Sequence, residues 1–292
     1  MYELRQLKNN SYFIDCPSRV GIVTDENGRV LLIDACSDRD GGKRILRATE
    51  SQGWTVDRVL VTHSHADHIG GLSHIVEKTG AVAYAKGIEA SFVKYPILEP
   101  VYVWGSYPHK GIRNKFFLAN GTEVCDISEL SLPQGFEILE LYGHSFDQIG
   151  LLTPDGVAYI GDALASKETL DKYGVTFLFD VRGYLDTLEG LKNLKADIFL
   201  PSHSEPLFDL LPIIDLNIQK TQQTCEVITD ICSQPLTFDE VLKRVFDRYE
   251  RTLNEGQYSI VGASVHAYLS YLRDEGIVTT EISENYMLWK RV

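Results

Sequence analysis

The chain has 292 residues, of which 44% are hydrophobic and 24% are charged. This balance fits one large or two modest folded domains and excludes disordered and fibrous classes. With 28 Lys and Arg against 41 Asp and Glu, the net charge of −13 opposes a broad grip on a nucleic acid backbone. No apolar run approaches the roughly 20 residues of a membrane-spanning helix, and the first residues lack the apolar segment of a signal peptide. We therefore expect a cytoplasmic protein with no membrane partner.

The N-terminal two thirds alternates strand-like and helix-like stretches. Short strands are predicted at 4–7, 12–15, 20–24 and 29–33, and the DENG turn joins the last two as a hairpin. The pattern then predicts, in order, a helix at 41–52, a buried strand at 56–61, strands at 81–85, 122–126 and 136–141, a hairpin over 149–160, a helix at 186–194 and a strand at 198–200. This order predicts an α/β fold with mostly mixed sheets.

The segment 91–118 breaks this pattern. It contains three prolines, two glycines and a dense set of aromatic residues. Long irregular segments inside a domain are usually functional or disordered, and the aromatic content argues against disorder. We expect a loop that forms a lid or pocket wall, with a surface loop packed only on itself as the alternative.

The composition changes near residue 207. Three helix-like stretches precede two strand-like ones, the order of a small winged-helix unit over residues 207–292. The segment that would read DNA carries Arg273 followed directly by Asp274 and Glu275, and the region from 206 onward has 13 Asp and Glu against 8 Lys and Arg. Nucleic acid binding is therefore not expected, and packing, pocket closure or homodimerisation are the remaining roles.

The motif THSHADHIGG, residues 62–71, directly follows the apolar strand at 56–61. It places His63, His65, Asp67 and His68 within six residues. Imidazoles and carboxylates are ligands of zinc, iron and manganese, and a turn at the end of a buried strand can direct several of them to one point. The motif therefore predicts a metal site.

Three further polar residues each follow a predicted strand: His144, Asp162 and His203. With them, five of the eight histidines and two aspartates lie at the carboxyl ends of predicted strands. Open α/β sheets place their sites at those ends. We expect these residues to share one site with the motif at 62–71.

The pattern HxHxDH, followed by a separate His, a separate Asp and a final His, resembles the metallo-β-lactamase superfamily of metal-dependent hydrolases. The resemblance covers residues 1 to about 205 and is nearest to the glyoxalase II and lactonase branches. It implies a four-layer αβ/βα sandwich for residues 1–206, with two divalent metal ions between two sheets. The expected metal is Zn²⁺, with Mn²⁺ or Fe as alternatives.

The resemblance also implies how the ligands divide. His63, His65 and His144 would hold one metal, and Asp67, His68 and His203 the other, with Asp162 bridging the two. Asp34 matches an aspartate that buttresses a ligand histidine, with a turn or capping role as the alternative.

The chemistry follows from two neighbouring cations, which lower the pKa of a shared water and polarise a carbonyl or phosphoryl oxygen. Water, as a metal-bridging hydroxide, is then the nucleophile. Asp67 is the residue expected to act in catalysis, because a spare carboxylate oxygen can orient the nucleophile or take a proton. Ser64 and Ser145, beside the ligands, are expected to make supporting hydrogen bonds.

Three residues are candidates for substrate binding: Tyr173, Tyr184 and His109. The two tyrosines lie between Asp162 and His203, where some lactonase and thioesterase relatives place a tyrosine that binds the substrate carbonyl. His109 lies in the aromatic segment 91–118.

The leading function is hydrolysis of a small ester-like substrate, a thioester or lactone, in a pocket roofed by 91–118 and flanked by residues 207–292. The region after 206 shows no basic cluster of the kind that glyoxalase II relatives use to hold glutathione. The alternatives are a phosphodiesterase or nuclease of the same superfamily, a mononuclear iron persulfide dioxygenase, and a structural metal centre in a protein whose C-terminal unit binds a partner.

Overall fold

The computed structural model describes residues 2–292 and contains a seven-stranded sheet, a four-stranded sheet and a C-terminal two-stranded hairpin. Across the first sheet the strands are β1 (Glu3–Lys8), β2 (Ser11–Asp15), β3 (Val20–Thr24), β4 (Arg29–Ile33), β5 (Thr55–Leu60), β6 (Val82–Ala85) and β7 (Cys125–Asp126). Across the second they are β11 (Ile198–Pro201), β10 (Val157–Gly161), β9 (Ile149–Leu152) and β8 (Glu137–Glu140).

Strand direction changes within both sheets. β1 to β4 form an antiparallel meander, whereas β4, β5, β6 and β7 run parallel. β8, β9 and β10 are antiparallel neighbours, and β11 joins β10 in parallel. The carboxyl ends of β4, β5, β10 and β11 carry the polar residues singled out from the sequence, as expected for strands that feed one site.

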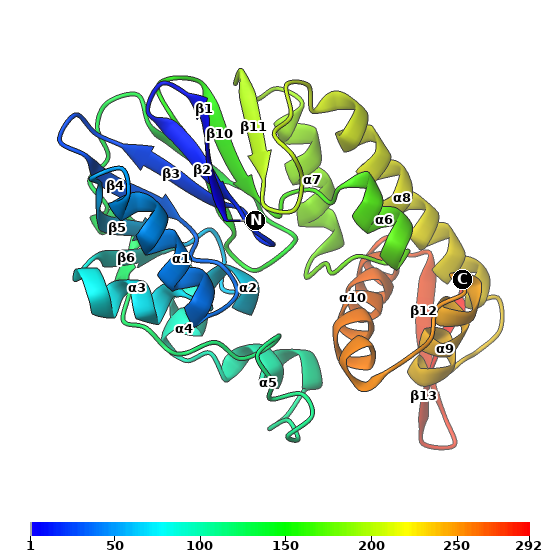
Figure 1. Cartoon of the computed structure of the whole chain (residues 1–292). Helices are drawn as coiled ribbons and strands as arrows, with labels where there is room; N and C mark the ends of the chain where they lie inside the picture. Colours follow the sequence, from blue (N-terminus) through cyan, green and yellow to red (C-terminus); the bar gives the residue numbers. More distant parts are fainter. Residues whose placement is uncertain (1) are drawn as a thin grey trace.

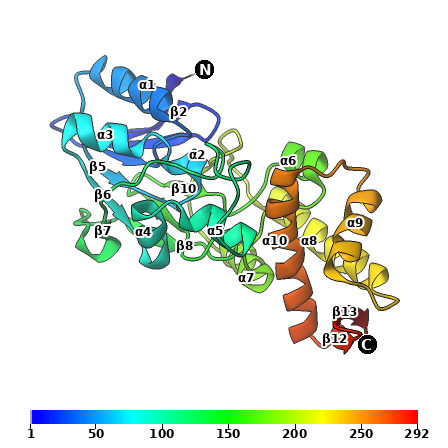
Figure 2. The same cartoon turned by 90° about the horizontal axis from the view of Figure 1, so that it is seen from below.

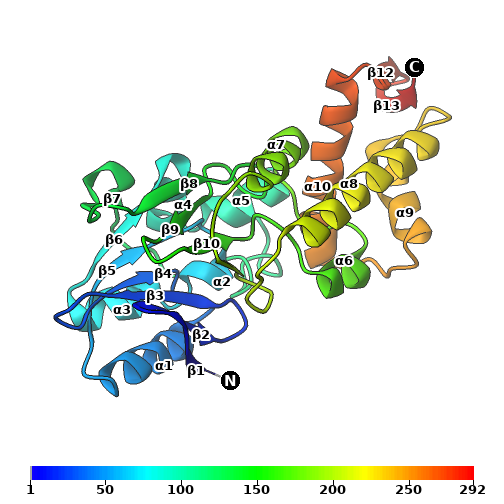
Figure 3. The same cartoon turned by 90° about the horizontal axis from the view of Figure 1, so that it is seen from above.

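Alternation along the strands explains why the sheets stack. Ile22 and Leu32 pack with helices on the outer face of the first sheet, whereas Val23 and Leu31 face the second sheet. In β10, Tyr159 faces the first sheet and Ile160 faces the helices beyond. The central strands therefore have two buried faces, and the two sheets lie face to face between layers of helices (Figures 1 and 3).

The helices of the first part lie outside the sheets or after strand ends. They are α1 (Arg39–Glu50), α2 (Ala66–Ile69), α3 (Leu72–Thr79), α4 (Gly87–Lys94), α5 (Leu98–Trp104), the short 3₁₀ turn η1 (Ile127–Glu129), α6 (Lys167–Tyr173) and α7 (Val181–Leu191). α1 and α3 cover the first sheet through Ile45 and Ile75, and α7 covers the second through Leu188. Four layers result.

The C-terminal region adds three helices and the hairpin: α8 (Leu211–Ile231), α9 (Phe238–Arg248), α10 (Glu255–Asp274), β12 (Val278–Ser283) and β13 (Tyr286–Arg291). Its order follows the sequence prediction; the winged-helix assignment itself stays a prediction. α8 packs on α7, so that the C-terminal elements extend from the layered part on one side (Figure 2). Val241, Leu269 and Trp289 belong to the same hydrophobic cluster as α7.

Most predicted elements are confirmed, with boundaries shifted by a few residues. The exception is 91–118, predicted as a loop, where α4 ends at Lys94 and α5 forms at Leu98–Trp104. Pro100 lies in the first turn of α5, where a missing N–H costs no helical hydrogen bond, and Gly105 ends the helix with a left-handed backbone. Pro100 therefore belongs to the start of a helix, and the prediction of a continuous loop over 91–118 is wrong at Leu98–Trp104.

None of the helices among residues 2–292 combines the length and the apolar character needed to cross a bilayer.

Tyr159 supplies a test of how the two sheets are held. Its buried hydroxyl donates to the carbonyls of Tyr12 (2.9 Å) and Ile22 (3.0 Å) across the intersheet space. We expect Tyr159→Phe to lower the free energy of unfolding by about 0.5–1.5 kcal/mol, because the hydrogen bonds of the hydroxyl across the intersheet space are lost while the two carbonyls keep their partners within the sheet. Urea denaturation measures this. Tyr84→Phe, at a partly buried position packed against the same cluster, is the control and should change stability by less; equal losses would contradict the assignment.

Candidate metal centre

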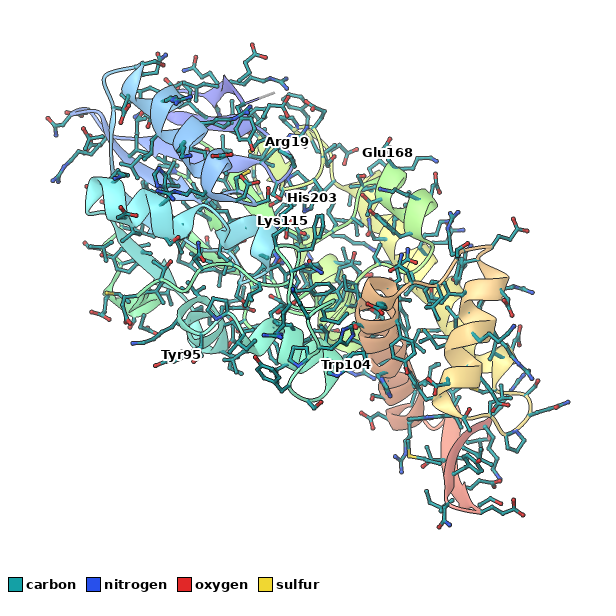
Figure 4. All side chains as sticks on the ribbon, turned by 60° about the horizontal axis from the view of Figure 1, so that its bottom comes forward. Arg19, Tyr95, Trp104, Lys115, Glu168 and His203 are labelled. Atoms are coloured by element: carbon teal, nitrogen blue, oxygen red, sulfur yellow. The ribbon has the colours of Figure 1, made fainter. Side chains whose placement is uncertain are left out.

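The shared strand-end placement brings seven side chains from four loops together. Residues 61–68 follow β5, residues 141–148 lie between β8 and β9, and Asp162 and His203 follow β10 and β11. Figure 4 shows His203 in the middle of the molecule, away from the tip of α5 that carries Trp104. All seven predicted ligands lie in three overlapping groups whose ligand atoms are within 4.8 Å of one another.

The first group is formed by three imidazoles, those of His63, His65 and His144. Nδ1 of His65 lies 3.0 Å from Nε2 of His63 and 3.0 Å from Nε2 of His144. Burial lowers the pKa of His65 to about 4 and that of His144 to about 3, and lowers the pKa of His63 well below its usual value. All three rings are therefore neutral at pH 7, the state in which imidazole binds a metal.

The second group contains Asp67, His68 and His203. Oδ2 of Asp67 lies 3.2 Å from Nε2 of His203 and 3.7 Å from Nε2 of His68. Asp162 lies between the groups, with Oδ2 at 3.6 Å from Nε2 of His144 and 3.2 Å from Nε2 of His203, and with Oδ1 at 3.5 Å from Nε2 of His68. A carboxylate that faces ligand atoms of both groups fits the bridging position.

The electrostatics of the second group favour positive charge. The Asp162 carboxylate is the main cause that raises the pKa of His203 to about 10. Burial alone would lower the pKa of His68, but Asp67, Asp162 and Asp34 outweigh it and hold that pKa well above its usual value. A cation placed among these carboxylates would supply the charge that the two imidazoles otherwise take up as protons.

Two buried atoms give an independent test of fit to a metal. Nε2 of His68 and Oδ1 of Asp162 are inaccessible to solvent and have no hydrogen-bond partner among residues 2–292. Buried polar atoms without partners are rare and call for an explanation such as an ion. Because both atoms face the cluster, the residues fit a divalent cation.

Asp34, the predicted buttress, holds two ligands at once. Its carboxylate accepts from Nδ1 of His68 (2.8 Å), from the Thr62 hydroxyl (2.7 Å) and from the Thr62 backbone N–H (2.8 Å). Since the Thr62 hydroxyl donates to Asp34, it accepts from Nδ1 of His63 at 3.0 Å. Both rings therefore keep Nε2 directed into the cluster. The backbone of Asp34 is left-handed, with φ +67°, a conformation that Asp and Asn tolerate better than most residues.

A neighbouring turn, not predicted from the sequence, orients the second group. Nδ1 of His203 donates to the Pro17 carbonyl at 3.0 Å, and the Ser18 hydroxyl donates to Oδ2 of Asp67 at 2.8 Å. The turn between β2 and β3 thus fixes one ring and one carboxylate.

Glu89, in α4, is a second functional residue that sequence reasoning missed. Its fully buried carboxylate accepts from the N–H of Ser64 (2.9 Å), the hydroxyl of Ser64, the hydroxyl of Ser145 (2.7 Å) and the N–H of Asp147 (3.1 Å). These donors belong to the two loops that carry the first group. The two serines therefore make the supporting hydrogen bonds expected of them, and one carboxylate clamps both loops.

Glu99, in α5, lies against the outer edge of the first group. Its Oε1 is 3.7 Å from Nε2 of His65, and burial raises the pKa of its carboxyl to about 8. The segment 91–118 therefore approaches the cluster through this one acidic side chain.

Two glycines are required for the ligand loops to fit. Gly143, before His144, has φ +108°, and a Cβ there would lie 2.1 Å from the backbone nitrogen of Tyr184. At Gly70 a Cβ would lie 2.1 Å from the carbonyl oxygen of Ser37, so glycine is required there by close backbone approach.

A cavity of about 490 Å³ opens directly on the cluster. His144, Asp162 and His203 form part of its wall. The remaining wall comes from residues 164–165, α6, residues 175–178, α7 and the C-terminal region. Its apolar side chains include Leu164, Val175, Phe177, Leu178, Val245, Phe246, Ile260 and Val261. No residue of 91–118 lines it, so the expectation that this segment roofs the pocket is wrong: α5 packs against α10 and lines a separate groove through Tyr102 and Trp104.

Two of the three candidate substrate-binding residues lie at the cavity, and the third does not. Tyr173 and Tyr184 both line the cavity. The Tyr184 hydroxyl donates to Oδ1 of Asn217 at 2.7 Å and so is already engaged, whereas the Tyr173 hydroxyl accepts from Lys172 at 2.8 Å. His109 lies outside the cavity, in an exposed turn with its ring against Trp104.

Comparison with known proteins decides the family. The family model described as the metallo-beta-lactamase superfamily matches residues 10–203. The chain belongs to the metallo-β-lactamase superfamily. It is a hydrolase of that superfamily, and the predicted α/β fold is confirmed, with an additional helical region at the C-terminus.

Curated relatives of this superfamily member are distant. A beta-lactamase-like protein 2 homolog of Drosophila melanogaster is 23% identical over 226 residues, 76% of this chain and 70% of the relative. An atrochrysone carboxyl ACP thioesterase of Passalora fulva is 21% identical over 271 residues, 89% and 72% of the two chains. A hydroxyacylglutathione hydrolase of Erythrobacter litoralis is 25% identical over 167 residues, and the match spans 57% of this chain and about half of that relative, 55%.

Solved structures share the fold over the whole chain. A beta-lactamase domain protein from Burkholderia ambifaria superposes with a TM-score of 0.75 at 17% identity, covering 99% of this chain and 94% of that one. A metallo-beta-lactamase family protein from Thermus thermophilus gives 0.73 at 20% identity, covering 97% and 99%. The C-terminal elements of this superfamily member therefore recur in other members.

Asp34→Asn tests the buttress. Asn keeps the size and tolerates the left-handed backbone, but it loses an acceptor for His68 and Thr62. We expect metal affinity to fall about 10- to 100-fold, measured by competition with a chelator. Asp57→Asn, at an ion pair with Arg29 and Arg58, is the control and should bind as the wild type does. Equal affinity of both variants would remove Asp34 from the metal centre.

Glu89→Ala tests the clamp. Four buried or partly buried donors lose their acceptor, so we expect the free energy of unfolding to fall by about 2–4 kcal/mol and metal retention to fall with it. Denaturation and elemental analysis measure the two effects. Glu123→Ala, which removes an exposed ion pair with Lys94, is the control and should cost under about 1 kcal/mol. A Glu89→Ala protein with wild-type stability and metal content would contradict the clamp.

Proposed function

We propose that the protein hydrolyses a small ester-like substrate, a thioester or lactone, with two divalent metal ions held by the seven-residue cluster. The observation that carries this proposal is the cavity, because it joins candidate metal ligands to a mostly apolar wall. Such a wall suits an acyl group, and the ligands on the same wall lie where its carbonyl would be held.

The first ion would be held by His63, His65 and His144, and the second by Asp67, His68 and His203, with Asp162 between them. When bound, two such ions make water acidic enough to supply hydroxide at neutral pH and polarise a carbonyl oxygen. We favour Zn²⁺, with Mn²⁺ or Fe as alternatives, because the donor set is imidazole and carboxylate without thiolate.

The protein's own contribution is orientation and proton transfer. Asp34 fixes the ring of one ligand directly and that of a second through the Thr62 hydroxyl, and the Pro17 carbonyl fixes the ring of a third. The Asp67 side chain is 43% exposed and its Oδ2 accepts from Ser18, so it can exchange a proton with solvent while it faces the cluster. We propose Asp67 as the residue that orients the attacking water and takes its proton.

The relatives support the ester-like class. One of them is named as a thioesterase and another as a hydroxyacylglutathione hydrolase, and both names describe thioester chemistry. The net charge of −13 opposes the phosphodiesterase and nuclease alternative.

Metal content and turnover on the same purified protein test the proposal. We expect two equivalents of Zn²⁺ or Mn²⁺ per chain, hydrolysis of thioesters or lactones, and loss of both on chelation. A single iron per chain, with oxygen consumed in the presence of a persulfide and no hydrolysis, would overturn the proposal in favour of the dioxygenase.

Two variants test how the ligands divide. Asp162→Ala should lose metal and activity together, by more than about 100-fold in activity, since removing a direct ligand costs more than removing an outer partner. Asp67→Ala should retain at least one metal ion per chain. Asp186→Ala, at an exposed position of α7, should retain both. Two ions in Asp162→Ala would show that the bridging assignment is wrong.

A further inference from the structure

The cavity wall contributed by α6 and the C-terminal region carries polar groups that the proposed chemistry does not use. Lys172, at the end of α6, and Arg251, between α9 and α10, both line the cavity. Among the residues that the structure describes, Asp162 is the only acidic one that lines it. The chain has 41 acidic and 28 basic residues, yet outside the metal centre this wall carries two cationic side chains and no acidic one. The cavity wall therefore favours a negatively charged ligand.

The two cations share one corner of the cavity. A guanidinium nitrogen of Arg251 donates to the backbone carbonyl of Asp171 at 2.8 Å, which places it next to Lys172. The Lys172 ammonium donates to the Tyr173 hydroxyl at 2.8 Å and lies 4.5 Å from the centre of that ring. Neither cation has a carboxylate within 4.0 Å in the described chain, whereas the neighbouring Lys167 pairs with Asp171. The corner therefore has two charges free to bind an anion.

A third polar group lies on the α10 side of the same cavity. Gln257 lines it, and its Oε1 is buried without a hydrogen-bond partner among residues 2–292. A buried amide oxygen that stays unpaired costs free energy unless a ligand donates to it. Gln257 thus marks a place where a bound molecule presents an N–H or O–H.

We propose that the substrate is an anionic amphiphile: an ester-like bond at the metal centre, an apolar body, a donor that meets Gln257 and an anion, carboxylate or phosphate, that meets Lys172 and Arg251. This inference rests on the proposed function. It names a substrate unlike a glutathione thioester, whose two carboxylates, ammonium and amides would meet mostly apolar wall.

The test compares hydrolysis of matched decanoyl thioesters. The neutral reference is the N-acetylcysteamine thioester; a sebacoyl counterpart places a carboxylate on the acyl end, and a phosphopantetheine counterpart places a phosphate on the thiol side. We expect one of the two anionic thioesters to exceed the neutral one in kcat/KM by at least about tenfold, mainly through KM, and the better one identifies the source of the anion.

The double variant Lys172→Gln/Arg251→Gln should remove this preference, lowering the ratio of anionic to neutral kcat/KM at least about tenfold. The matched control is Lys167→Gln/Lys243→Gln, which removes the same charge from α6 and α9 at exposed positions outside the cavity and should keep the ratio. Gln257→Leu should raise KM for thioesters that carry an amide N–H. A preference that survives in the double variant, or falls equally in the control, overturns the proposal.

A binding measurement separates this proposal from the proposed function. Calorimetry of the metal-free protein with decyl phosphate and with sebacate, each compared with decanol, needs no turnover. We expect decyl phosphate or sebacate to bind more tightly than decanol. We also expect that anion to bind at least about tenfold more weakly to Lys172→Gln/Arg251→Gln than to the control variant. Weaker anion binding by this double variant, in a protein that hydrolyses no thioester or lactone, would reject the proposed function but support the anion site at Lys172 and Arg251. Hydrolysis without a preference for anionic thioesters, or with a preference for S-lactoylglutathione, would reject the anion site at Lys172 and Arg251 but support the proposed hydrolase function.

Discussion

The crowding of five imidazoles and two carboxylates into one largely buried cluster is the constraint on which the rest of the structure depends. Burial keeps the first three rings neutral, while the carboxylates of the second group draw positive charge onto His68 and His203. Such an arrangement is costly for a chain that only needs to fold, because His63, His68 and Asp162 hold charges and lone pairs close together and mostly out of water. A bound cation reverses the balance, and the orphaned atoms of His68 and Asp162 show where it would act.

Two carboxylates outside the cluster convert strand ends into a rigid site. Asp34 accepts hydrogen bonds from the loop after β5. Glu89 accepts hydrogen bonds both from that loop and from the loop between β8 and β9. Each is buried and accepts three or more hydrogen bonds, so its charge is satisfied by donors that would otherwise be free to move. The stacking of two sheets brings the loops near one another, and these hydrogen bonds then fix their separation.

The ligand set could be predicted from the sequence because its signal is local: HxHxDH lies in one loop, and each remaining ligand follows an apolar run. Asp34 could be predicted for the same reason, since it ends a recognisable strand. Glu89, Ser18 and Glu99 could not, because each belongs to a segment far from its partner in the sequence and looks like an ordinary polar residue there. The expected cavity wall is wrong for a related reason: the aromatic residues of 91–118 suggest a pocket, but Tyr102 packs on Phe179 and Trp104 packs on Tyr258 of α10 instead.

The division of labour within the chain follows from where the walls come from. Every candidate metal ligand lies on the layered part, at loops fixed by buried hydrogen bonds, whereas Val245, Phe246 and Gln257 enter the cavity from the C-terminal helices. None of the candidate ligands lies on α9 or α10, so side chains on these two helices can change without removing a ligand. Under the proposed function, the layered part would therefore hold the metal ions, and the side chains of the C-terminal helices would select the substrate, a separation that lets one site architecture serve different substrates on a shared fold.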